Sequence, residues 1–338
     1  MDKRLTISIF AYKQAKQIKS QLDGIATYDG DDIEVVISDD TTDDTIRDLV
    51  ASYSDNRFRY VKNDIGSGAD GNYLNAILSA ETDYVWIFRS SDSVIPDRIS
   101  SVINLIETNP DCTLYFPSSV SGKGFETRNY QDCRCNEVWH SGTLHPSGYI
   151  INKKYCDFNL YKRLIIKHFG DYKASNVAFS LLQADLGLKG ETLFSEIAAW
   201  KYANTVARAD QAVNAPGGKN PFGLEFEYKR YALMLDYASG ITDDKKQRDF
   251  LNLVIHTYAK QILHVFGKRN SSEDFLRHYG CEKVEFNPYK ERQKFKDETV
   301  SIMRNLGLNA KPYRKIVARE ALIYGVIKPT IYRIRNKK

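Results

Sequence analysis

Two adjacent acids, Asp39 and Asp40, stand directly after an apolar stretch and are the first residues of the chain with a type and spacing suited to chemistry. A carboxylate at the carboxyl end of a buried strand can accept a hydrogen bond from a ribose hydroxyl or from the N–H of a base. The polar run that follows, 41–45, equally suits the start of a helix, because threonine and aspartate side chains cap helix N-termini. Taken alone, these residues favour capping and turn formation over nucleotide binding.

The elements around these acids form a regular pattern. Apolar runs predict strands over 5–10, 32–40, 57–63 and 83–88, and the amphipathic stretches between them predict helices over 13–25, 43–53 and 71–81. Strict alternation of strand and helix predicts a parallel sheet with helices on both faces. Ligands of such sheets bind beyond the carboxyl ends of the strands, so we expect the residues that follow each strand to converge on one site.

Four short stretches resemble, in order and at compatible spacing, the signatures of family 2 glycosyltransferases of the GT-A fold. The stretch ISIFAYK resembles the opening strand of the family, which ends in Pro-Thr-Tyr-Asn, and this implies that Phe10, Ala11 and Tyr12 line the base pocket. The stretch EVVISDDTTDDT resembles Asp-Asp-Gly-Ser-Thr-Asp-Gly-Thr, with Ser38 in the place of the first acid. Asp39 then takes the place of the acid that contacts the uridine.

The third stretch, NDIGSGADGN, resembles Gly-x-x-x-Ala-Arg-Asn. It keeps Gly66 and Asn72, whereas Asp70 and Gly71 replace the alanine and the arginine. The resemblance covers about the first hundred residues and implies a GT-A domain, that is, a mostly parallel sheet flanked by helices. Asp70 and Asn72 are accordingly predicted to lie in the donor site.

The fourth stretch, YVWIFRSSDSVIP, stands where many relatives carry the metal motif Asp-x-Asp-Asp and departs from that motif. A divalent cation, Mn²⁺ or Mg²⁺, held by carboxylate oxygens would neutralise a nucleotide-sugar diphosphate as the glycosidic bond breaks. This chain offers Asp92 alone as a metal ligand, preceded by Arg89 and Ser91. We therefore expect weak or absent metal dependence, with Arg89 or Lys219 supplying the positive charge. The alternative is a solvent-facing Arg89 with Asp92 as the sole metal anchor, helped by water.

The resemblance implies inversion at the anomeric carbon, and an inverting transfer needs a general base to deprotonate the acceptor hydroxyl. Relatives often provide this base as Glu-Asp at a helix start, about a dozen residues before a glycine. Counting back from Gly190 reaches positions 178 and 179, which hold no acid. Asp171 is the predicted substitute, with Asp185 and His145 behind it. Each of the three could instead be a helix cap, a surface acid or a structural histidine.

Zinc-type ligands also occur in the middle of the chain, at Cys133, Cys135, His140 and His145. Thiolate and imidazole are the ligands of zinc, but the C-x-C spacing is not that of the usual knuckle and disfavours a zinc site. The two histidines could instead bond sugar hydroxyls.

The chain is expected to divide into a nucleotide-sugar-binding half (1–115), an acceptor-binding half (116–212) and a helical C-terminal region (213–338). The last region opens with a loop rich in glycine and proline, 213–223. Its composition suits a lid that orders over bound donor, and a plain interdomain linker equally well.

Positive charge is concentrated at the C-terminal end. The segment 311–338 holds nine Lys or Arg residues against the single acid Glu320, whereas the whole chain has a net charge of only +5. The body is thus mildly acidic, which argues against a nucleic acid as partner. Apolar residues interleaved with the basic ones predict an amphipathic helix on an anionic membrane surface, and a basic helix packed on the body is the alternative. Five irregularly spaced cysteines and an N-terminus unlike a signal peptide predict a cytoplasmic protein, peripheral on the inner face of the cytoplasmic membrane.

The sequence therefore predicts an enzyme, a nucleotide-sugar-dependent hexosyltransferase with a UDP-sugar as the expected donor. Its acceptor would be a glycan or lipid-linked saccharide in the synthesis of a bacterial surface polysaccharide such as capsule or O-antigen. The alternative is a non-catalytic partner subunit that binds nucleotide sugar in a polysaccharide assembly complex. The acids missing from the metal motif and from positions 178 and 179 are the evidence for that alternative.

Overall fold

The structure is a computed structural model of the 338-residue chain, and it describes residues 3–63, 67–120, 125–126, 130–135, 146–172, 176–203, 222–278 and 281–330. The contacts divide the chain into two compact units, each described by itself below. The first comprises residues 1–162 and 176–206, and the second comprises residues 163–175 and 207–338.

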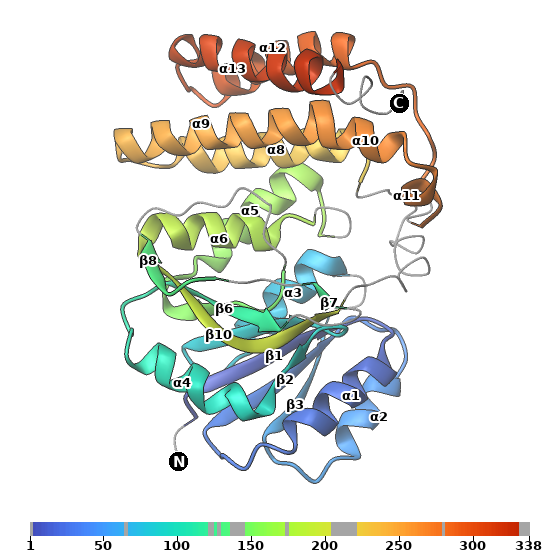
Figure 1. The fold of residues 1–338 in the computed structure, drawn as a ribbon, viewed down its shortest axis with the longest axis vertical. Coiled ribbons are helices and arrows are strands. Elements are labelled where there is room, and N and C mark those ends of the chain that lie inside the picture. Colours follow the sequence, from blue (N-terminus) through green and yellow to red (C-terminus); the bar gives the residue numbers. More distant parts are fainter. Residues whose placement is uncertain are drawn as a thin grey trace. The chain divides into compact units, whose positions relative to one another are not determined.

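The first unit is an α/β domain in which strands and helices alternate (Figure 1). Its described strands are β1 (Leu5–Ala11), β2 (Ile33–Asp39), β3 (Phe58–Lys62), β4 (Tyr84–Arg89), β5 (Ser93–Val94), β6 (Leu114–Val120), β7 (Phe125–Glu126), β8 (Cys133–Cys135), β9 (Ile150–Asn152) and β10 (Thr192–Ala203). Its α-helices are α1 (Ala15–Ile25), α2 (Thr45–Ala51), α3 (Gly68–Leu78), α4 (Ile99–Glu107), α6 (Ala178–Lys189) and the first part of α5 (Phe158–Phe169). Short 3₁₀ turns are η1 (Pro96–Arg98) and η2 (Lys153–Tyr155).

The strands form one mixed, mostly parallel sheet with the order β3-β2-β1-β4-β9-β6-β10-β5. The first four strands are parallel, as the alternating pattern predicted, and β6 pairs in parallel with β10. The short strand β9 runs antiparallel to both β4 and β6 and so joins the two parallel parts. The predicted fold class, a mostly parallel sheet flanked by helices, is confirmed.

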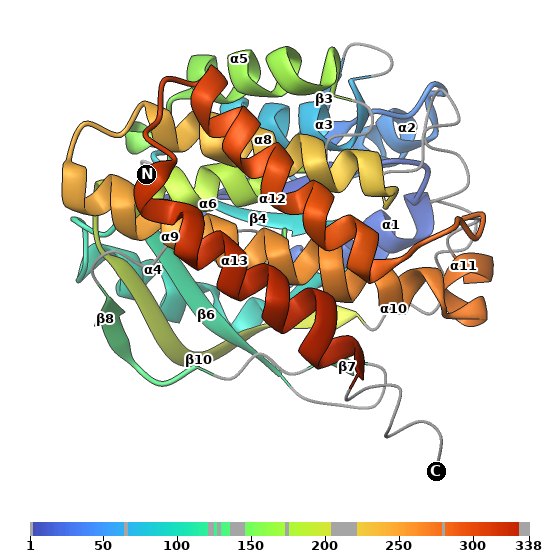
Figure 2. The same ribbon diagram turned by 90° about the horizontal axis from the view of Figure 1, so that it is seen from above.

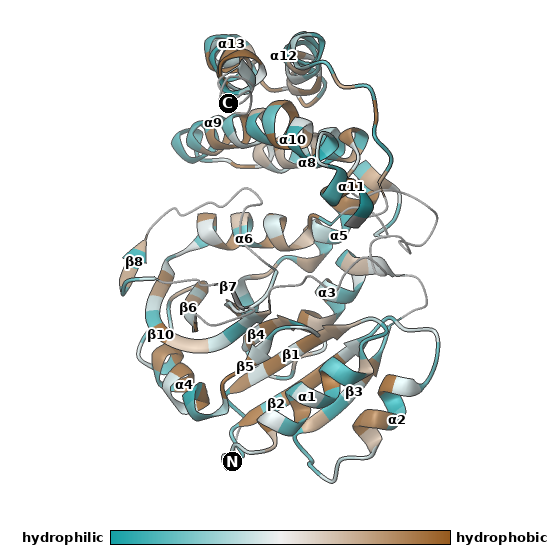
Figure 3. Cartoon of the chain, turned by 45° about the vertical axis from the view of Figure 1, so that its right-hand side comes forward, coloured by the Kyte–Doolittle hydropathy of each residue, from teal (hydrophilic) through white to brown (hydrophobic). Residues whose placement is uncertain are grey.

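Alternation along β1 explains how the sheet is covered. Its odd-numbered residues enter the main core together with apolar side chains of α1 and α4, among them Ile7, Leu22 and Ile103. On the opposite face the Ser8 hydroxyl donates to the Ala76 carbonyl of α3, at 2.6 Å. Successive strand residues point to opposite faces, so one strand is buried by helices on both sides. In Figure 3 both β1 and β2 are accordingly hydrophobic along most of their length.

The longest strand, β10, was not among the strands that the sequence predicted. Its pairing with β6 shifts register between Ser195 and Ala198 and again between Ala198 and Trp200. Such bulges add unpaired residues and change which face each side chain takes. The period-two pattern is therefore lost from the sequence TLFSEIAAWKYA, although the backbone continues as a strand.

The second unit is helical. Its described helices are the end of α5, α8 (Leu224–Ser239), α9 (Asp244–Lys260), α10 (Phe266–Asn270), α11 (Glu273–His278), α12 (Pro288–Asn305) and α13 (Arg314–Leu322), with turns η3 (Gln261–Val265), η4 (Lys311–Tyr313) and η5 (Ile323–Ile327). Asp243 and Asn287 cap α9 and α12, because their side chains accept hydrogen bonds from first-turn N–H groups. Figure 2 shows α12 beside α13 in this unit. None of the helices in the described part of the chain is long and apolar enough to cross a membrane.

Candidate functional site

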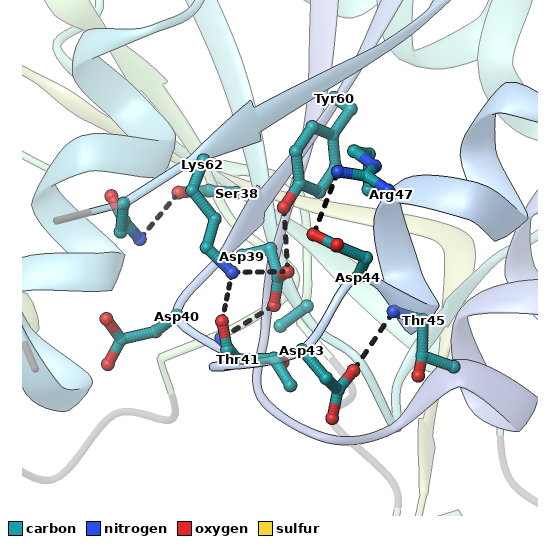
Figure 4. A network of polar contacts seen from close by, with 12 residues as sticks. Ser38, Asp39, Asp40, Thr41, Asp43, Asp44, Thr45, Arg47, Tyr60 and Lys62 are labelled. Atoms are coloured by element: carbon teal, nitrogen blue, oxygen red, sulfur yellow. Dashed lines mark hydrogen bonds and ion pairs between the residues drawn. The ribbon is translucent and has the colours of Figure 1, made fainter. Parts of the chain in front are cut away.

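Parallel pairing brings the carboxyl ends of β2, β1 and β4 to one edge of the sheet. In the register of the sheet, Ala11 at the end of β1 is opposite Asp39 of β2, and Phe10 is opposite Arg89 of β4. The predicted donor residues at the ends of these three strands thus share one edge, as expected. The polar contacts at the β2 end are drawn in Figure 4.

Asp39 is fully buried, and neighbouring residues at this edge of the sheet contact its carboxylate. Its Oδ1 accepts from the backbone N–H of Thr41 at 2.8 Å, and its Oδ2 accepts from the Tyr60 hydroxyl at 3.0 Å. The Lys62 ammonium lies 3.6 Å from the same Oδ2 and also donates to the Thr41 carbonyl. Burial, followed by the hydrogen bond to Asp39, raises the pKa of Tyr60, so the phenol remains a donor.

Sequence reasoning missed Tyr60 and Lys62. They are two residues apart on β3, and Lys62 is the register partner of Asp39. Had the order of the strands been known, a tyrosine and a lysine on one face at the end of the strand next to Asp39 would have identified them as candidates. The pair places a phenol and a cation beside the carboxylate predicted to contact the nucleoside.

The second acid of the pair, Asp40, anchors the start of α3. Its Oδ1 accepts from the Ser67 hydroxyl at 2.9 Å and its Oδ2 accepts from the Gly68 N–H at 3.0 Å. Burial raises the pKa of Asp40, and hydrogen bonds from Ser67 and Gly68 offset part of that effect. The capping interpretation of the acidic run holds for Asp43, whose Oδ1 accepts from the N–H of Thr45 at the start of α2, at 3.0 Å. Asp40 instead holds the start of α3.

Asn72 is the centre of a buried polar network that joins the strand ends. Its Nδ2 donates to the Ala11 carbonyl at 2.7 Å, and its Oδ1 accepts from the Ser38 hydroxyl at 2.8 Å. Asn63, just after β3, donates to both Asn72 Oδ1 and Ser38 Oγ. This network ties β1, β2, the β3 end and α3 together, and so fixes the backbone of the predicted base pocket.

The predicted base-pocket residues differ in exposure. Ala11 is buried, whereas Phe10 and Tyr12 are half-buried, and Phe10 packs edge-on against Tyr73 with ring centroids 5.6 Å apart. Lys13 follows with a φ of 56°, an uncommon conformation for a residue other than glycine, and its N–H donates to Thr41 Oγ1 at 3.0 Å. Backbone strain of this kind concentrates at functional sites. Here it bends the chain where β1 leaves the sheet.

At the end of β4, Arg89 and Asp92 form a buried bidentate ion pair. Arg89 Nε donates to Asp92 Oδ2 and Nη2 donates to Asp92 Oδ1, both at 2.8 Å. Asp92 has no exposed surface, and Arg89 is 8% exposed. The alternative of a solvent-facing Arg89 is therefore wrong, because the guanidinium is turned inward onto the carboxylate. Ser91 lies half-buried in the turn between the two.

These residues do not fit a divalent cation. Mn²⁺ or Mg²⁺ requires several hard oxygen ligands in near-octahedral geometry. Asp92 is the only acid of the degenerate motif, and both its oxygens accept from Arg89. Within the described ranges, no group of three or more His, Cys, Asp or Glu side chains is arranged to hold a metal ion. The zinc alternative has only Cys133 and Cys135 among those residues, with sulfurs 3.7 Å apart, since His140 and His145 lie outside them.

The predicted bases occupy different surroundings. Asp185 is buried in α6, where it accepts from the Tyr161 hydroxyl and from Lys189 Nζ, the latter at 2.7 Å. Burial first, and Asp185 second, raise the pKa of the nearby Cys156 thiol to about 12. Asp185 is thus part of an internal cluster. Asp171 belongs to the second unit and is half-buried. His145 and Lys219 lie outside the described residues.

Asp70 performs a structural role at the start of α6. Its carboxylate accepts from the backbone N–H groups of Val177 and Ala178, at 2.8 and 3.0 Å. These N–H groups have no partner inside the helix, and a negative charge is favourable at a helix N-terminus. Asp70 of α3 therefore holds the first turn of α6, the place where relatives often carry the general base. Its predicted contact with donor stays a prediction.

Comparison with known proteins agrees with this architecture. Residues 6–170 match the family described as glycosyl transferase family 2. Over 86 residues the chain is 29% identical to abequosyltransferase RfbV of Salmonella typhimurium, covering 25% of this chain and 26% of that protein. Over 99 residues it is 30% identical to succinoglycan biosynthesis protein ExoO of Rhizobium meliloti, covering 29% of this chain and 28% of that protein. The alignments thus span little more than a quarter of either relative.

Solved structures are similar over nearly the whole chain. The fold matches a crystal structure of residues 1–349 of S. aureus TarS with a TM-score of 0.59, over 98% of this chain and 92% of that one, at 13% identity. The same TarS fragment in complex with UDP matches with a TM-score of 0.58 at 15% identity. At such identity the likeness shows the fold alone. Residues 6–170 thus belong to glycosyltransferase family 2, and the sheet and its flanking helices have the GT-A fold.

Proposed function

We propose that this protein transfers a hexosyl group, with inversion, from a UDP-sugar to a glycan or lipid-linked acceptor in the synthesis of a bacterial surface polysaccharide. The observation that carries the proposal is the shared edge of β1, β2 and β4, which holds Asp39 opposite Ala11 and Arg89 opposite Phe10. A nucleoside and its diphosphate need an acceptor for the base and a cation for the phosphates, and this edge offers both.

The choice of uridine is supported by the fold match to TarS, which has been crystallised with UDP. In this chain Asp39 would accept the N–H of the base. Because Asp39 has no exposed surface, that contact requires Tyr60 or Lys62 to move away from Oδ2. Lys62 is the group more easily displaced, since its side chain is 36% exposed and its ammonium lies 3.6 Å from the carboxylate.

The polysaccharide role is supported by the names of the two relatives, an abequosyltransferase and a succinoglycan biosynthesis protein. Deprotonation of the acceptor hydroxyl is assigned to Asp171 rather than to Asp185. The carboxylate of Asp185 is buried and accepts from Tyr161 and Lys189, so it is poorly placed to reach an acceptor. An Asp171→Asn variant should lose kcat while its affinity for UDP stays unchanged.

Attachment to an anionic membrane surface through α13 and η5 forms part of the proposal. The acid Glu320 is buried and bonded to His256 Nδ1 at 2.9 Å, whereas Lys315 and Lys328 are exposed. Leu322 and Ile327 are also exposed, at 46% and 43%. Exposed apolar residues among basic ones suit an interface of acyl chains and anionic headgroups.

Co-sedimentation with vesicles tests this part of the proposal. We expect the protein to bind phosphatidylglycerol vesicles and to lose that binding on Leu322→Ser with Ile327→Ser. Leu78→Ser, which changes an equally exposed leucine of the first unit, is the control and should bind like wild type. Equal binding to uncharged phosphatidylcholine would contradict the electrostatic part.

The catalytic proposal is tested by a thermal-shift screen of UDP-, GDP- and dTDP-sugars, followed by detection of released UDP in the presence of acceptor. A ligand that binds only the folded state raises the melting temperature by mass action. We expect a shift with UDP-sugars that Asp39→Ala abolishes. A selective shift without UDP release in any acceptor mixture would instead favour the non-catalytic subunit, an alternative supported by the sequestered Asp185.

A further inference from the structure

We propose that Arg89 is the fixed cation of the donor site, locked in place by Asp92, so that this chain binds the diphosphate of its donor without a divalent metal ion. This inference rests on the proposed function and names the group that does the electrostatic work there. Metal motifs of the Asp-x-Asp type bring a cation to the diphosphate. Here the cation is part of the chain.

The ion pair leaves hydrogen-bond donors on the guanidinium. Arginine has five N–H groups in a planar fork, and Asp92 accepts one from Nε and one from Nη2. Within the part of the chain that the structure describes, Nη1 of Arg89 donates to no side chain or carbonyl. A guanidinium held on one side by a carboxylate can thus offer its other side to phosphate oxygens, its preferred bidentate partners.

The backbone of Arg89 is held by residues from distant parts of the sequence. Its N–H donates to the Ser147 hydroxyl at 2.7 Å, and its carbonyl accepts from Gln21 Nε2 at 3.1 Å. The same amide donates to the carbonyl of Ser90 at 2.7 Å. Three contacts from two other segments therefore fix the end of β4, as preorganised electrostatic stabilisation requires.

The side chains of the pair are held from β10. The Tyr202 ring lies 5.5 Å from the guanidinium carbon of Arg89, and the Ala203 N–H donates to Asp92 Oδ1 at 3.1 Å. The aromatic face attracts a cation, and the N–H favours the ionised carboxylate. Both charges of the pair are thus kept at the carboxyl edge by the strand that the sequence did not predict.

The same geometry disfavours a metal ion at this place. A dication coordinated by Asp92 would have to displace two charge-assisted hydrogen bonds. It would then stand beside a guanidinium that cannot lose its proton and would be repelled by it. Asp92 therefore serves as a positioning residue for Arg89, and not as a metal ligand.

In the transfer, the bond between the anomeric carbon and the β-phosphate oxygen breaks, and its electron pair stays on that oxygen. A new bond forms from the acceptor oxygen to the anomeric carbon, and the acceptor proton passes to the general base. The leaving nucleoside diphosphate gains one negative charge, which Arg89 stabilises without being consumed. The register places Arg89 opposite Phe10, beside the predicted base pocket, where that charge develops.

The deciding experiment measures UDP affinity by titration calorimetry with the full chain, once in excess chelator and once with saturating Mn²⁺. We expect dissociation constants that agree within about twofold, a difference too small to reflect a metal bridge. Tightening by Mn²⁺ of about tenfold or more, or loss of binding in chelator, would overturn the inference and leave the proposed function intact. If neither UDP nor any UDP-, GDP- or dTDP-sugar of the thermal-shift screen binds in either condition, both this inference and the proposed function are rejected.

Variants then assign the charge to Arg89. In chelator, Arg89→Gln should weaken UDP binding at least about tenfold. The affinity of Arg89→Lys should lie between those of wild type and Arg89→Gln, because lysine keeps the charge but lacks the planar set of guanidinium N–H donors. The matched control is Arg57→Gln, which breaks another poorly exposed arginine–aspartate pair, Arg57 with Asp55, before the start of β3. It should leave UDP affinity unchanged. Unchanged affinity in Arg89→Gln contradicts the inference, and if that variant fails to fold, the metal comparison on wild type still decides.

Discussion

The carboxyl ends of β2 and β4 solve one electrostatic problem in two ways. Each holds an aspartate with no exposed surface, Asp39 and Asp92, and a buried carboxylate must be paired or hydrogen-bonded to be tolerated. At β4 the partner is a bidentate guanidinium. At β2 the partners are a backbone N–H and a phenol, with the Lys62 ammonium further away.

The difference separates a fixed charge from an exchangeable one. Replacing a neutral donor or a half-exposed lysine by a ligand N–H costs Asp39 little, because one hydrogen bond is exchanged for another. Removing Asp92 from Arg89 would leave two uncompensated buried charges. The β2 end is therefore suited to recognising a ligand, and the β4 end is suited to presenting a permanent charge.

The strongest way to break this comparison is Asp92→Asn. It leaves the Arg89 guanidinium buried without a counter-charge, and we expect the free energy of unfolding to fall by about 3–5 kcal/mol. Urea unfolding followed by circular dichroism measures it. The double variant Arg89→Met with Asp92→Leu should lose less than Asp92→Asn, because no lone charge remains.

The control is Asp23→Asn, which breaks the exposed pair of Lys19 and Asp23 on α1. Solvent and salt screen an exposed i,i+4 pair, so this variant should be nearly neutral. If Asp23→Asn and Asp92→Asn lose similar free energies of unfolding, burial does not make the Arg89–Asp92 pair more important to stability than an exposed pair.

Tyr60→Phe examines the β2 end. The change removes the hydroxyl that donates to Asp39 Oδ2 and leaves the backbone N–H bond on Oδ1 in place. Hydrogen bonds to charged groups contribute about 1.5–3 kcal/mol, so we expect a loss of about 2 kcal/mol in unfolding free energy. Tyr53→Phe, which removes a phenol donor from the exposed Asp23, is the control and should lose less. A larger loss than in Asp92→Asn would reverse the ranking of the two strand ends.

Asp40 gives the β2 end a pH dependence of defined sign. Burial raises its pKa above the ordinary value of 3.8, so the folded state holds this proton more tightly than the unfolded state. Its contribution to stability is thus complete below pH 3.8 and is lost as pH rises through the raised pKa. In urea titrations, the stability of Asp40→Asn relative to wild type should rise with pH across that window.

Asp43→Asn provides a control of opposite sign. The hydrogen bond from Thr45 lowers the pKa of the exposed Asp43, so its contribution is present above pH 3.8 and is lost as pH falls through the lowered value. The stability of Asp43→Asn relative to wild type should therefore fall with rising pH. Parallel slopes for the two variants would contradict the assignment of the Asp40 shift to burial.

The sequence was sufficient for the regular part of the fold. Alternating apolar runs located β1, β2, β3 and β4 because each is a parallel strand paired without register shifts. β1, β2 and β4 are largely buried, whereas β3 at the edge of the sheet is partly exposed. Position at a strand end then singled out Asp39 and Arg89. The irregular strand β10 was not predicted, because its register shifts interrupt the two-residue alternation of apolar and polar side chains that indicates a strand.

Contacts between distant segments could not be read from the sequence. Arg89 and Asp92 are three residues apart, but only the turn between them, closed by Ala203, decides that they pair rather than face solvent. Asp70 and the N–H group of Val177 are 107 positions apart. The sequence near Asp70 does not indicate that it caps α6, so it supports only the prediction that Asp70 lies in the nucleotide-sugar donor site.

The smallest expected effect, that of Lys62→Met, sharpens the comparison most. An ion pair at 3.6 Å with a partner 36% exposed contributes less than about 1 kcal/mol, so the free energy of unfolding should hardly change. If Lys62 is the group that a bound nucleoside displaces from Asp39, its removal abolishes a competitor and should tighten UDP binding measured by calorimetry. Arg59→Met, at a residue three positions earlier on β3 that pairs with Glu34, leaves Asp39 untouched and should not tighten UDP binding. Weaker UDP binding in Lys62→Met would mean that the ammonium itself contacts the ligand, and that the β2 end, like the β4 end, presents a charge to the donor.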